Sequence, residues 1–182
     1  INQAVIFCGG YGTRFNTGNK KILKNLVKIK NIPILKMIID IYSNQGVKQF
    51  ILLGGFKFNL LKKFELKYSN KNLKIKAINT GLGTSTAERI VKAKEYLDDF
   101  FYLTYGDSLA NFSANKFKNH RNAKNFYIST YDFKIPYGVL KTGKLKKISS
   151  INEKNFKISI NAGFYVMNKN ILKFIKKGDI FE

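Results

Sequence analysis

Short apolar runs alternate along the chain with segments whose apolar residues recur every three or four positions. The runs are rich in branched and aromatic side chains, which is typical of buried strands, and the intervening segments have the period of an amphipathic helix. Pro33 at the start of one such segment and Gly46 beyond its end favour helix initiation and termination. The pattern predicts strands at Ala4–Cys8, Gln49–Leu53, Leu73–Asn79, Phe100–Thr104 and Phe126–Tyr131, and helices at 33–44, Phe58–Tyr68 and Thr86–Leu97.

Beyond Pro136 the pattern changes to short strands and one last helical segment. It predicts strands at Gly138–Lys141, Leu145–Ile151 and Asn161–Met167, and a helix at Asn168–Lys177. Alternation of strands and helices indicates an α/β fold. A chain of 182 residues that is 45% hydrophobic can bury one substantial core. We therefore predict a single domain over residues 1–182, built on a doubly wound, mostly parallel, Rossmann-like sheet with helices on both faces.

Glycine-containing turns directly follow the first and the fourth predicted strands. Gly9-Gly10-Tyr11-Gly12 follows the first, and Gly106-Asp107 follows the fourth. These two strands are neighbours in the common doubly wound order, in which ligands bind beyond the carboxyl ends of the strands. We therefore expect both turns to face one crevice.

The first of these turns is either an ordinary tight turn or a phosphate-binding loop. It lacks the third glycine of the dinucleotide fingerprint and the Gly-Lys-Ser/Thr of a P-loop. The backbone N–H groups of Gly9, Gly10 and Gly12 can nevertheless cradle phosphate oxygens. Thr13 adds a hydroxyl donor, and Arg14 adds a charged fork. The turn therefore predicts a triphosphate-binding site.

The formal net charge of +22 at pH 7 raises the question of a nucleic-acid surface. Only Arg14, Arg89 and Arg121 are arginines, the residue that reads phosphates and bases through a planar fork. The lysines are spread along the whole chain rather than gathered in one stripe, which is typical of solvated faces. We therefore predict no nucleic-acid partner, and we expect the positive field to attract small anionic substrates.

Other features of the composition exclude whole classes of site. The sequence has no apolar run of membrane-spanning length and no secretory leader, so we predict no membrane partner and a cytoplasmic protein. The single cysteine, Cys8, cannot form an internal disulfide, which fits a reducing compartment. His120 is the one histidine, and we expect it to be solvated. One histidine and one cysteine exclude a zinc site and a Cys–His nucleophile pair.

The segment Gly-Gly-Tyr-Gly-Thr-Arg that ends at Arg14 resembles the signature of the sugar-1-phosphate nucleotidylyltransferases. In that family an apolar strand leads into Gly-Gly-x-Gly-Thr-Arg, then a loop ending in Lys-Pro, then a Pro-Ile-Leu helix, and Ile-Pro-Ile-Leu opens the first predicted helix here. The resemblance implies catalytic roles on the phosphates for Arg14 and for Lys24, which falls where the family's lysine is expected. Lys24 is followed by Asn25 and not by proline, so Lys20 and Lys21 compete for this role.

The stretch from Asn79 to Ile90 resembles the cytidylyltransferase version of the family, especially that of the glucose-1-phosphate cytidylyltransferases. That version reads Asp-Thr-Gly-x-x-Thr-x-Thr-Gly-Gly-Arg, from which Asn79, Ala87 and Glu88 depart. Ser85 and Glu88 also have the spacing of a capping box, which alone could explain part of the stretch. The resemblance implies that CTP is bound by Gly9, Gly10, Gly12, Thr13, Arg14, Thr80, Gly81, Thr84, Thr86 and Arg89.

Later segments are similar to the family elements that hold the metal and the acceptor. The segment Thr-Tyr-Gly-Asp that ends at Asp107 matches a family element, which implies that Asp107 is catalytic and holds Mg²⁺; the alternative is a simple Gly-Asp turn. Glu153 and Lys154 could alternatively form an ordinary surface pair. The resemblance implies that the sugar phosphate is bound by Tyr137, Gly138, Glu153, Lys154 and Asn161, with Lys154 on its phosphate group.

The reaction that the resemblance implies is in-line attack of a sugar-1-phosphate on the α-phosphate of CTP, dependent on Mg²⁺, as in polysaccharide biosynthesis. Its products are a CDP-sugar and pyrophosphate. The alternatives are another nucleoside triphosphate, a non-sugar phosphate acceptor, or a nucleotide-binding relic with weak catalysis. The family takes a second metal carboxylate from a later segment, so we expect either a chain that continues beyond Glu182 or a site with one carboxylate. A homo-oligomer is compatible with the resemblance.

Overall fold

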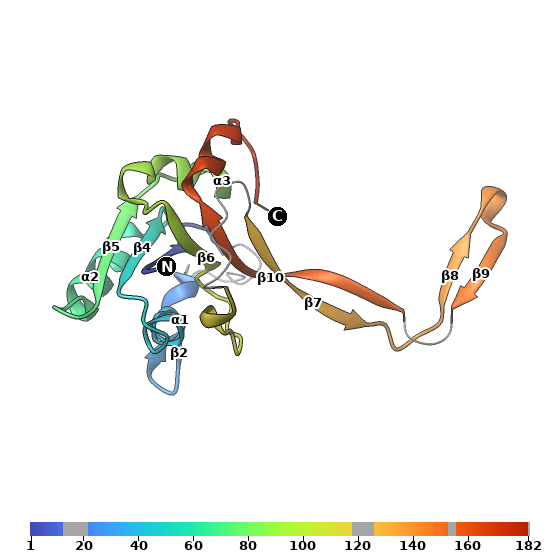
Figure 1. Cartoon of the computed structure of the whole chain (residues 1–182), viewed down its shortest axis with the longest axis horizontal. Coiled ribbons are helices and arrows are strands. Elements are labelled where there is room, and N and C mark those ends of the chain that lie inside the picture. The colour runs from blue at the N-terminus through green and yellow to red at the C-terminus, as the bar shows by residue number, and fades with distance from the viewer. Residues whose placement is uncertain (13–21, 118–125, 153–155, 182) are drawn as a thin grey trace. The chain divides into compact units, whose positions relative to one another are not determined.

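A computed structural model of the protein, which describes residues 1–12, 22–117, 126–152 and 156–181, contains a six-stranded sheet (Figure 1). In spatial order its strands are β5 (Lys74–Asn79), β4 (Gln49–Gly54), β1 (Gln3–Phe7), β6 (Phe100–Tyr105), β10 (Lys157–Asn168) and β7 (Tyr127–Lys134). β5, β4, β1 and β6 are parallel, and β10 runs antiparallel to β6. The order of the four parallel strands is that of a doubly wound sheet, as predicted.

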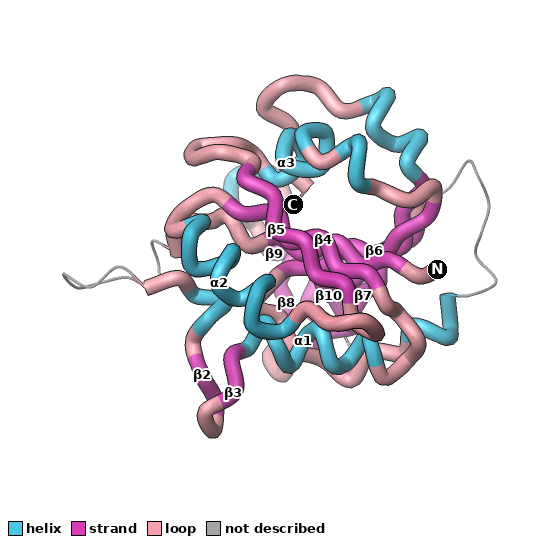
Figure 2. The backbone as a smooth tube through the Cα atoms, turned by 90° about the vertical axis from the view of Figure 1, so that its left-hand side faces the viewer, coloured by secondary structure: helices cyan, strands magenta, loops and turns pink. Residues whose placement is uncertain are grey.

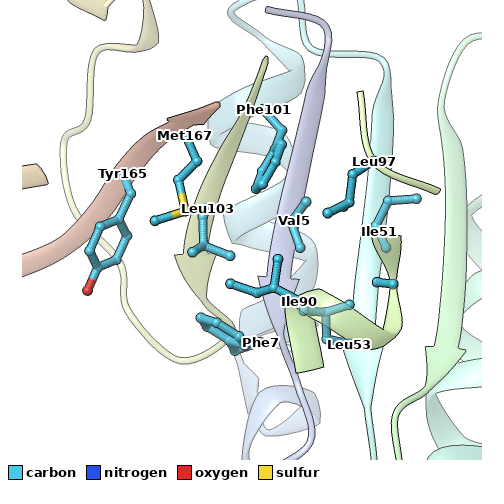
Figure 3. Packing of buried hydrophobic residues seen from close by; sticks show 11 residues of the cluster. Val5, Phe7, Ile51, Leu53, Ile90, Leu97, Phe101, Leu103, Tyr165 and Met167 are labelled. Atoms are coloured by element: carbon cyan, nitrogen blue, oxygen red, sulfur yellow. The ribbon is translucent and has the colours of Figure 1, made fainter. Parts of the chain in front are cut away.

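Helices cover both faces of this sheet, as predicted (Figure 2). α3 (Thr86–Lys92) packs through Ile90 into an apolar cluster that includes Val5 and Leu103 (Figure 3). α1 (Ile34–Ser43) covers the opposite face, where the rings of Tyr42 and Tyr102 have centroids 5.5 Å apart. Successive side chains of a strand point to opposite faces, so the nearly unbroken apolar strands supply both cores.

The helices follow the predicted pattern over most of their lengths. α2 has the predicted bounds, Phe58–Tyr68. Pro33 is extended (φ −60°, ψ 139°) and precedes α1, so it stands at the N-cap position, without a side-chain capping bond, rather than at the predicted first helical position. α3 ends at Lys92, and the remainder of its predicted length contains only a 3₁₀ turn, Lys94–Tyr96. Among the described residues, no helix has the length and apolar character needed to cross a bilayer.

The last predicted helix, Asn168–Lys177, is wrong in type. The structure has a 3₁₀ helix there, Lys169–Phe174, with no fully buried side chain, and Phe174 is 74% exposed. Short α-helices gain most of their stability from packing an apolar face, and in this segment Leu172 packs, partly buried, against the core cluster while Phe174 does not.

A two-stranded hairpin, β2 (Lys28–Ile29) with β3 (Ile32–Pro33), leads into α1. Its turn residues Lys30 and Asn31 have φ values of 48° and 65°, the left-handed conformation that tight hairpin turns require. The hydrophobic pattern does not predict this hairpin, because each strand has only two residues.

The chain divides into two compact units, Ile1–Tyr127 with Phe164–Glu182, and Ile128–Gly163. The second unit contains most of β7, the first part of β10, and the hairpin of β8 (Val139–Thr142) and β9 (Ile148–Asn152), in which Leu140 lies opposite Ile151. That residues 1–182 form a single domain stays a prediction.

Candidate active site

Three parallel strands end next to one another at the carboxyl edge of the sheet. Phe7 of β1 is in register with Leu53 of β4 on one side and with Tyr105 of β6 on the other. The N–H of Cys8 donates to the carbonyl of Leu53 at 2.9 Å, and the N–H of Gly106 donates to the carbonyl of Phe7 at 3.0 Å. The turns after β1 and β6 therefore leave the sheet at adjacent points on one edge, as predicted.

The glycine turn after β1 has a closed side and an open side. A Cβ at Gly9 would lie 2.2 Å from Nη1 of Arg89, so a side chain of the protein itself requires glycine there. Gly10 is exposed, and a Cβ at that position would meet no atom of the described residues within 4 Å. Gly12 has a φ of 60°, which glycine adopts without steric cost. The open side at Gly10 is therefore the part of the turn that a ligand can approach.

Lys24 and Asp107 form an ion pair between the carboxylate and Nζ of the lysine. Lys24 begins a short 3₁₀ helix, Lys24–Leu26, and lies between the buried residues Leu23 and Asn25; its own side chain projects outward and is 44% exposed. The Asn25 amide packs directly on the turn of Asp107, because a Cβ at Gly106 would lie 2.2 Å from its Nδ2. The 3₁₀ helix that carries Lys24 is thereby fixed against the turn that carries Asp107.

Arg89 lies under the glycine turn rather than in solvent, with 5% of its surface exposed. Its Nη2 donates to the carbonyl of Gly9 at 3.2 Å, and its Nη1 donates to the carbonyls of Gly54 and Gly81, each at 3.0 Å. Nη1 also donates to Oγ1 of Thr80 at 2.5 Å. Burial lowers the pKa of the Arg89 guanidinium, but an ordinary value above about 12 keeps it charged.

The predicted nucleotide-binding threonines are engaged within the protein. Thr80 donates from Oγ1 to the carbonyl of Gly54 at 2.6 Å, and Thr84 donates to the carbonyl of Thr80 at 2.7 Å. Thr86 accepts from the N–H of Phe181 at 2.9 Å. These bonds shape the loop between β5 and α3, so the threonines present a fixed surface rather than free hydroxyl groups.

Lys92 is a residue of this region that the sequence patterns did not identify. Its Nζ donates to the carbonyl of Thr80 at 2.8 Å and to Oγ1 of Thr84 at 3.1 Å. It stands three residues after Arg89 on α3, on the same side of the helix, and this spacing is the signal that could have found it.

A capping box fixes the start of α3 and hence the placement of Arg89. The N–H of Glu88 donates to Oγ of Ser85 at 3.3 Å, and the N–H of Ser85 donates to the Glu88 carboxylate at 3.1 Å. The pKa of Glu88 is lowered, first by this backbone bond and then by the Ser85 hydroxyl. The capping alternative for this stretch is therefore present together with the arginine contacts.

The chemistry of the described residues fits a magnesium site with one carboxylate. No three His, Cys, Asp or Glu side chains gather within the described part of the chain. Mg²⁺ is commonly held by one or two carboxylates together with substrate phosphates, which Asp107 can satisfy. Burial, and then the charge of Asp107, raise the pKa of the Cys8 thiol, so this buried residue stays protonated and is a poor nucleophile.

The residues predicted to bind the acceptor belong to the second unit or lie outside the described residues. Tyr137, which is 77% exposed, and Gly138 join β7 to β8. Asn161 lies in β10, and its side-chain oxygen accepts from the N–H of Gly163 at 2.8 Å. Their roles stay predictions. The positions with a prediction that fall outside the described residues are Thr13, Arg14, Lys20, Lys21, His120, Glu153 and Lys154.

Comparison with known proteins places the chain in a family. Residues 3–182 match the nucleotidyl transferase family. The chain is 33% identical to the probable glucose-1-phosphate cytidylyltransferase of Bacillus subtilis, over 96% of this chain and 78% of that protein. It is 28% identical to the D-glycero-alpha-D-manno-heptose 1-phosphate guanylyltransferase of Campylobacter jejuni, over 93% and 77%. Among solved structures, HddC from Yersinia pseudotuberculosis, complexed with GMP-PN, superposes with a TM-score of 0.74 at 26% identity, over 95% and 79%.

Proposed function

Because the chain belongs to the nucleotidyl transferase family and is a nucleotidyltransferase of the sugar-1-phosphate type, we propose that it joins CTP to a sugar-1-phosphate. In this reaction a phosphate oxygen of the sugar phosphate attacks the α-phosphorus of CTP. A new P–O–P linkage forms, and the bond from the α-phosphorus to the β-phosphate oxygen breaks. The products are a CDP-sugar and pyrophosphate.

The observation that carries the proposal is the arrangement at the carboxyl edge of β1 and β6. The open glycine turn at Gly10 leaves one strand, and the Asp107 turn leaves the neighbouring strand. Lys24 is already paired with Asp107, so a cation and a carboxylate stand together at this edge. Backbone N–H donors, a lysine and a carboxylate are the groups that a metal-bound triphosphate needs. Arg14, outside the described residues, is proposed to add a second cation.

The proposed reaction does not require a side chain to act as a base. A phosphate monoester has a second pKa of about 6, so the attacking sugar phosphate is already mostly a dianion at neutral pH. The barrier lies in bringing two polyanions together and in stabilising the charge that develops on the leaving group. Positioning and positive charge meet both needs, and Lys24 supplies charge at the edge where the phosphates are proposed to lie.

Asp107 is the residue that we propose to hold Mg²⁺, with the triphosphate supplying further oxygen ligands. When bound, the ion would neutralise phosphate oxygens and polarise the phosphorus under attack. The carboxylate is only partly exposed, at 27%, which suits an ion bound between the sheet edge and a substrate.

Cytosine as the base rests on two supports. The sequence from Asn79 to Arg89 resembles the cytidylyltransferase version of the family, and a relative named as a probable cytidylyltransferase shares 33% identity with the chain. GTP is the strongest competitor, because a relative named as a guanylyltransferase shares 28%. The loop before α3 is the part of the site proposed to face the base.

The acceptor is proposed to be bound by Tyr137, Gly138 and Asn161, and by Glu153 and Lys154, which lie outside the described residues. An exposed tyrosine offers both a ring and a hydroxyl to a sugar. Lys154 is the proposed partner of the acceptor's phosphate.

Pyrophosphate release tests the proposal. The purified chain is incubated with Mg²⁺, each of the four ribonucleoside triphosphates, and a panel containing hexose-1-phosphates, a heptose-1-phosphate and glycerol-3-phosphate. We expect release that needs both substrates and is fastest with CTP and a sugar-1-phosphate. Faster release with GTP would mean that the base is guanine rather than cytosine. Faster release with glycerol-3-phosphate would mean that the acceptor is not a sugar-1-phosphate. Binding of Mg·CTP without release in any combination would contradict the proposed reaction.

A further inference from the structure

Arg89 joins three separate segments of the region in which the nucleotide is proposed to bind. Its guanidinium reaches Gly9 in the turn after β1, Gly54 at the end of β4, and Thr80 with Gly81 in the loop after β5. These segments are far apart in sequence, and no other described side chain donates to all three. The planar fork of arginine presents donors in several directions at fixed angles, which suits this task.

Glycines make room for the guanidinium. A Cβ at Gly9 would lie 2.2 Å from Nη1, and a Cβ at Gly55 would lie 2.8 Å from the same atom and 2.9 Å from the Gly9 carbonyl. Atoms do not approach so closely, so both positions exclude any larger residue while Arg89 keeps its place. The conformation of the glycine turn and the position of the arginine therefore depend on each other.

Among the described residues, the groups that hydrogen-bond the buried charge of Arg89 are carbonyl and hydroxyl oxygens. No described carboxylate pairs with it, although it is 95% removed from solvent. A cation in this situation retains a positive potential in its surroundings, because dipoles solvate the charge without cancelling it. That potential is centred directly beneath Gly9, next to the open side of the turn at Gly10.

We propose that Arg89 is a positioning residue, which holds the glycine turn and the loop after β5 in their nucleotide-binding shape and places positive charge beneath them. The inference rests on the proposed function only in taking this turn to be the triphosphate site. It differs from the role implied by family resemblance, because Arg89 acts through Gly9 and Gly81 and its charged groups are already engaged by the protein.

Chemical rescue tests this role. In Arg89→Ala the space left by the side chain can admit free guanidinium, a planar cation, or urea, a neutral molecule of nearly the same shape. We expect Arg89→Ala to raise the nucleotide KM at least about tenfold, the cost of losing buried hydrogen bonds to a charged group. The KM for the sugar phosphate should stay unchanged. Guanidinium at about 20 mM, far below the molar range that unfolds proteins, should restore most of the loss, and urea should not.

The controls separate charge, shape and folding. Arg89→Lys keeps the charge but not the fork, and it should behave like Arg89→Ala. Lys94→Ala removes an exposed cation just beyond α3 and should leave both KM values unchanged, and sodium chloride matches the ionic strength of guanidinium. If Arg89→Ala does not fold by circular dichroism, Arg89→Gln takes its place. An unchanged nucleotide KM, or equal effects of guanidinium and urea in a folded variant, would overturn the inference.

Binding of Mg·CTP and Mg·GTP by calorimetry is measured beside turnover. A wild-type chain that binds nucleotide but releases no pyrophosphate would refute the proposed reaction, while the loss and rescue of binding would still test Arg89. A wild-type chain with turnover and an Arg89→Ala variant with full affinity would refute only the positioning role.

Discussion

The loop before α3 and the segment Ile128–Gly163 differ sharply in how they are built. The loop is tied to the ends of β1 and β4 through Arg89, which is buried, and through Thr80, which is 1% exposed. In the second unit Tyr137 is 77% exposed and Leu145 is 89% exposed, and β9 has no buried residue. One side of the proposed reaction is therefore assigned to packed residues and the other to surface residues.

This difference teaches how substitutions in the two regions should behave. On the nucleotide side a side chain such as Arg89 supports the fold and the ligand site at once, so stability and nucleotide affinity should change together. In the second unit an exposed side chain supports little of the fold, so acceptor affinity should change while stability does not. The following substitutions test this contrast.

Asp107→Asn should have the largest effect on turnover. The amide keeps the shape of the carboxylate but loses the charge proposed to hold Mg²⁺, so kcat should fall about 10²- to 10³-fold, as on removal of a major electrostatic group. Nucleotide binding should change much less. Steady-state pyrophosphate release measures the effect, and Asp40→Asn, which alters a surface pair with Lys36, is the matched control. Full activity in Asp107→Asn would remove Asp107 from the metal role.

Lys24→Gln should have the next largest effect. The substitution keeps most of the side-chain length but removes the ammonium group beside Asp107, so kcat/KM for the nucleotide should fall about 10- to 100-fold. Lys36→Gln removes a lysine from a comparable ion pair on α1 and should have no effect. Equal kinetics in the two variants would mean that Lys24 does not contact the phosphates.

Tyr137→Ala should separate the two regions cleanly. We expect the KM for the sugar phosphate to rise about tenfold through the loss of an aromatic contact, with the KM for the nucleotide and the melting temperature unchanged. Tyr131→Ala, in the same unit and 62% exposed, is the control. A rise in the nucleotide KM instead would mean that Tyr137 contacts the nucleotide and not the sugar phosphate.

Ser85→Ala should have the smallest effect, and on stability first. Loss of the capping box at α3 should cost about 1 kcal/mol, which lowers the melting temperature by about 2–4 °C in a chain of this size. Nucleotide affinity should weaken in parallel, because α3 positions Arg89. Ser150→Ala, on the exposed strand β9, should change neither quantity. A loss of stability without any change in nucleotide affinity would contradict the expectation that the two change together in the region around α3.

Much of the scaffold is predictable because hydrophobic period and turn residues act locally. The four parallel strands, their order and the bounds of α2 follow from runs such as Phe100–Thr104 and from the rule for doubly wound sheets. The 3₁₀ helix at Lys169–Phe174 does not follow, because its sequence has a helical period, but which of its apolar side chains find a partner depends on the tertiary structure: Leu172 packs against the core cluster and Phe174 is exposed.

The sequence indicates which residue types make up the candidate site, but not the direction in which each side chain points. The glycine turn, Lys24 and Asp107 are recognisable from the sequence, and the structure adds that Lys24 and Asp107 are paired. For Arg89 the sequence indicates a cation near a nucleotide loop. It cannot reveal that the guanidinium points inward to Gly9, since that depends on how α3 packs against residues distant in the chain.

Gly10→Ala tests most directly the central claim that the open side of the glycine turn binds the triphosphate. Substitution of Gly10 and of its neighbour Gly9 should have opposite effects, on activity and on stability respectively. Gly10 does not have a left-handed backbone, and a Cβ there meets no atom of the described part of the chain within 4 Å, so the variant should keep the wild-type melting temperature. Its new methyl group would occupy the face proposed for the triphosphate, and kcat/KM for the nucleotide should fall about 100-fold, as for a misplacement of about 1 Å. Gly9→Ala, by contrast, should lose stability through its clash with Arg89. A folded Gly10→Ala enzyme with wild-type kcat/KM would contradict the account.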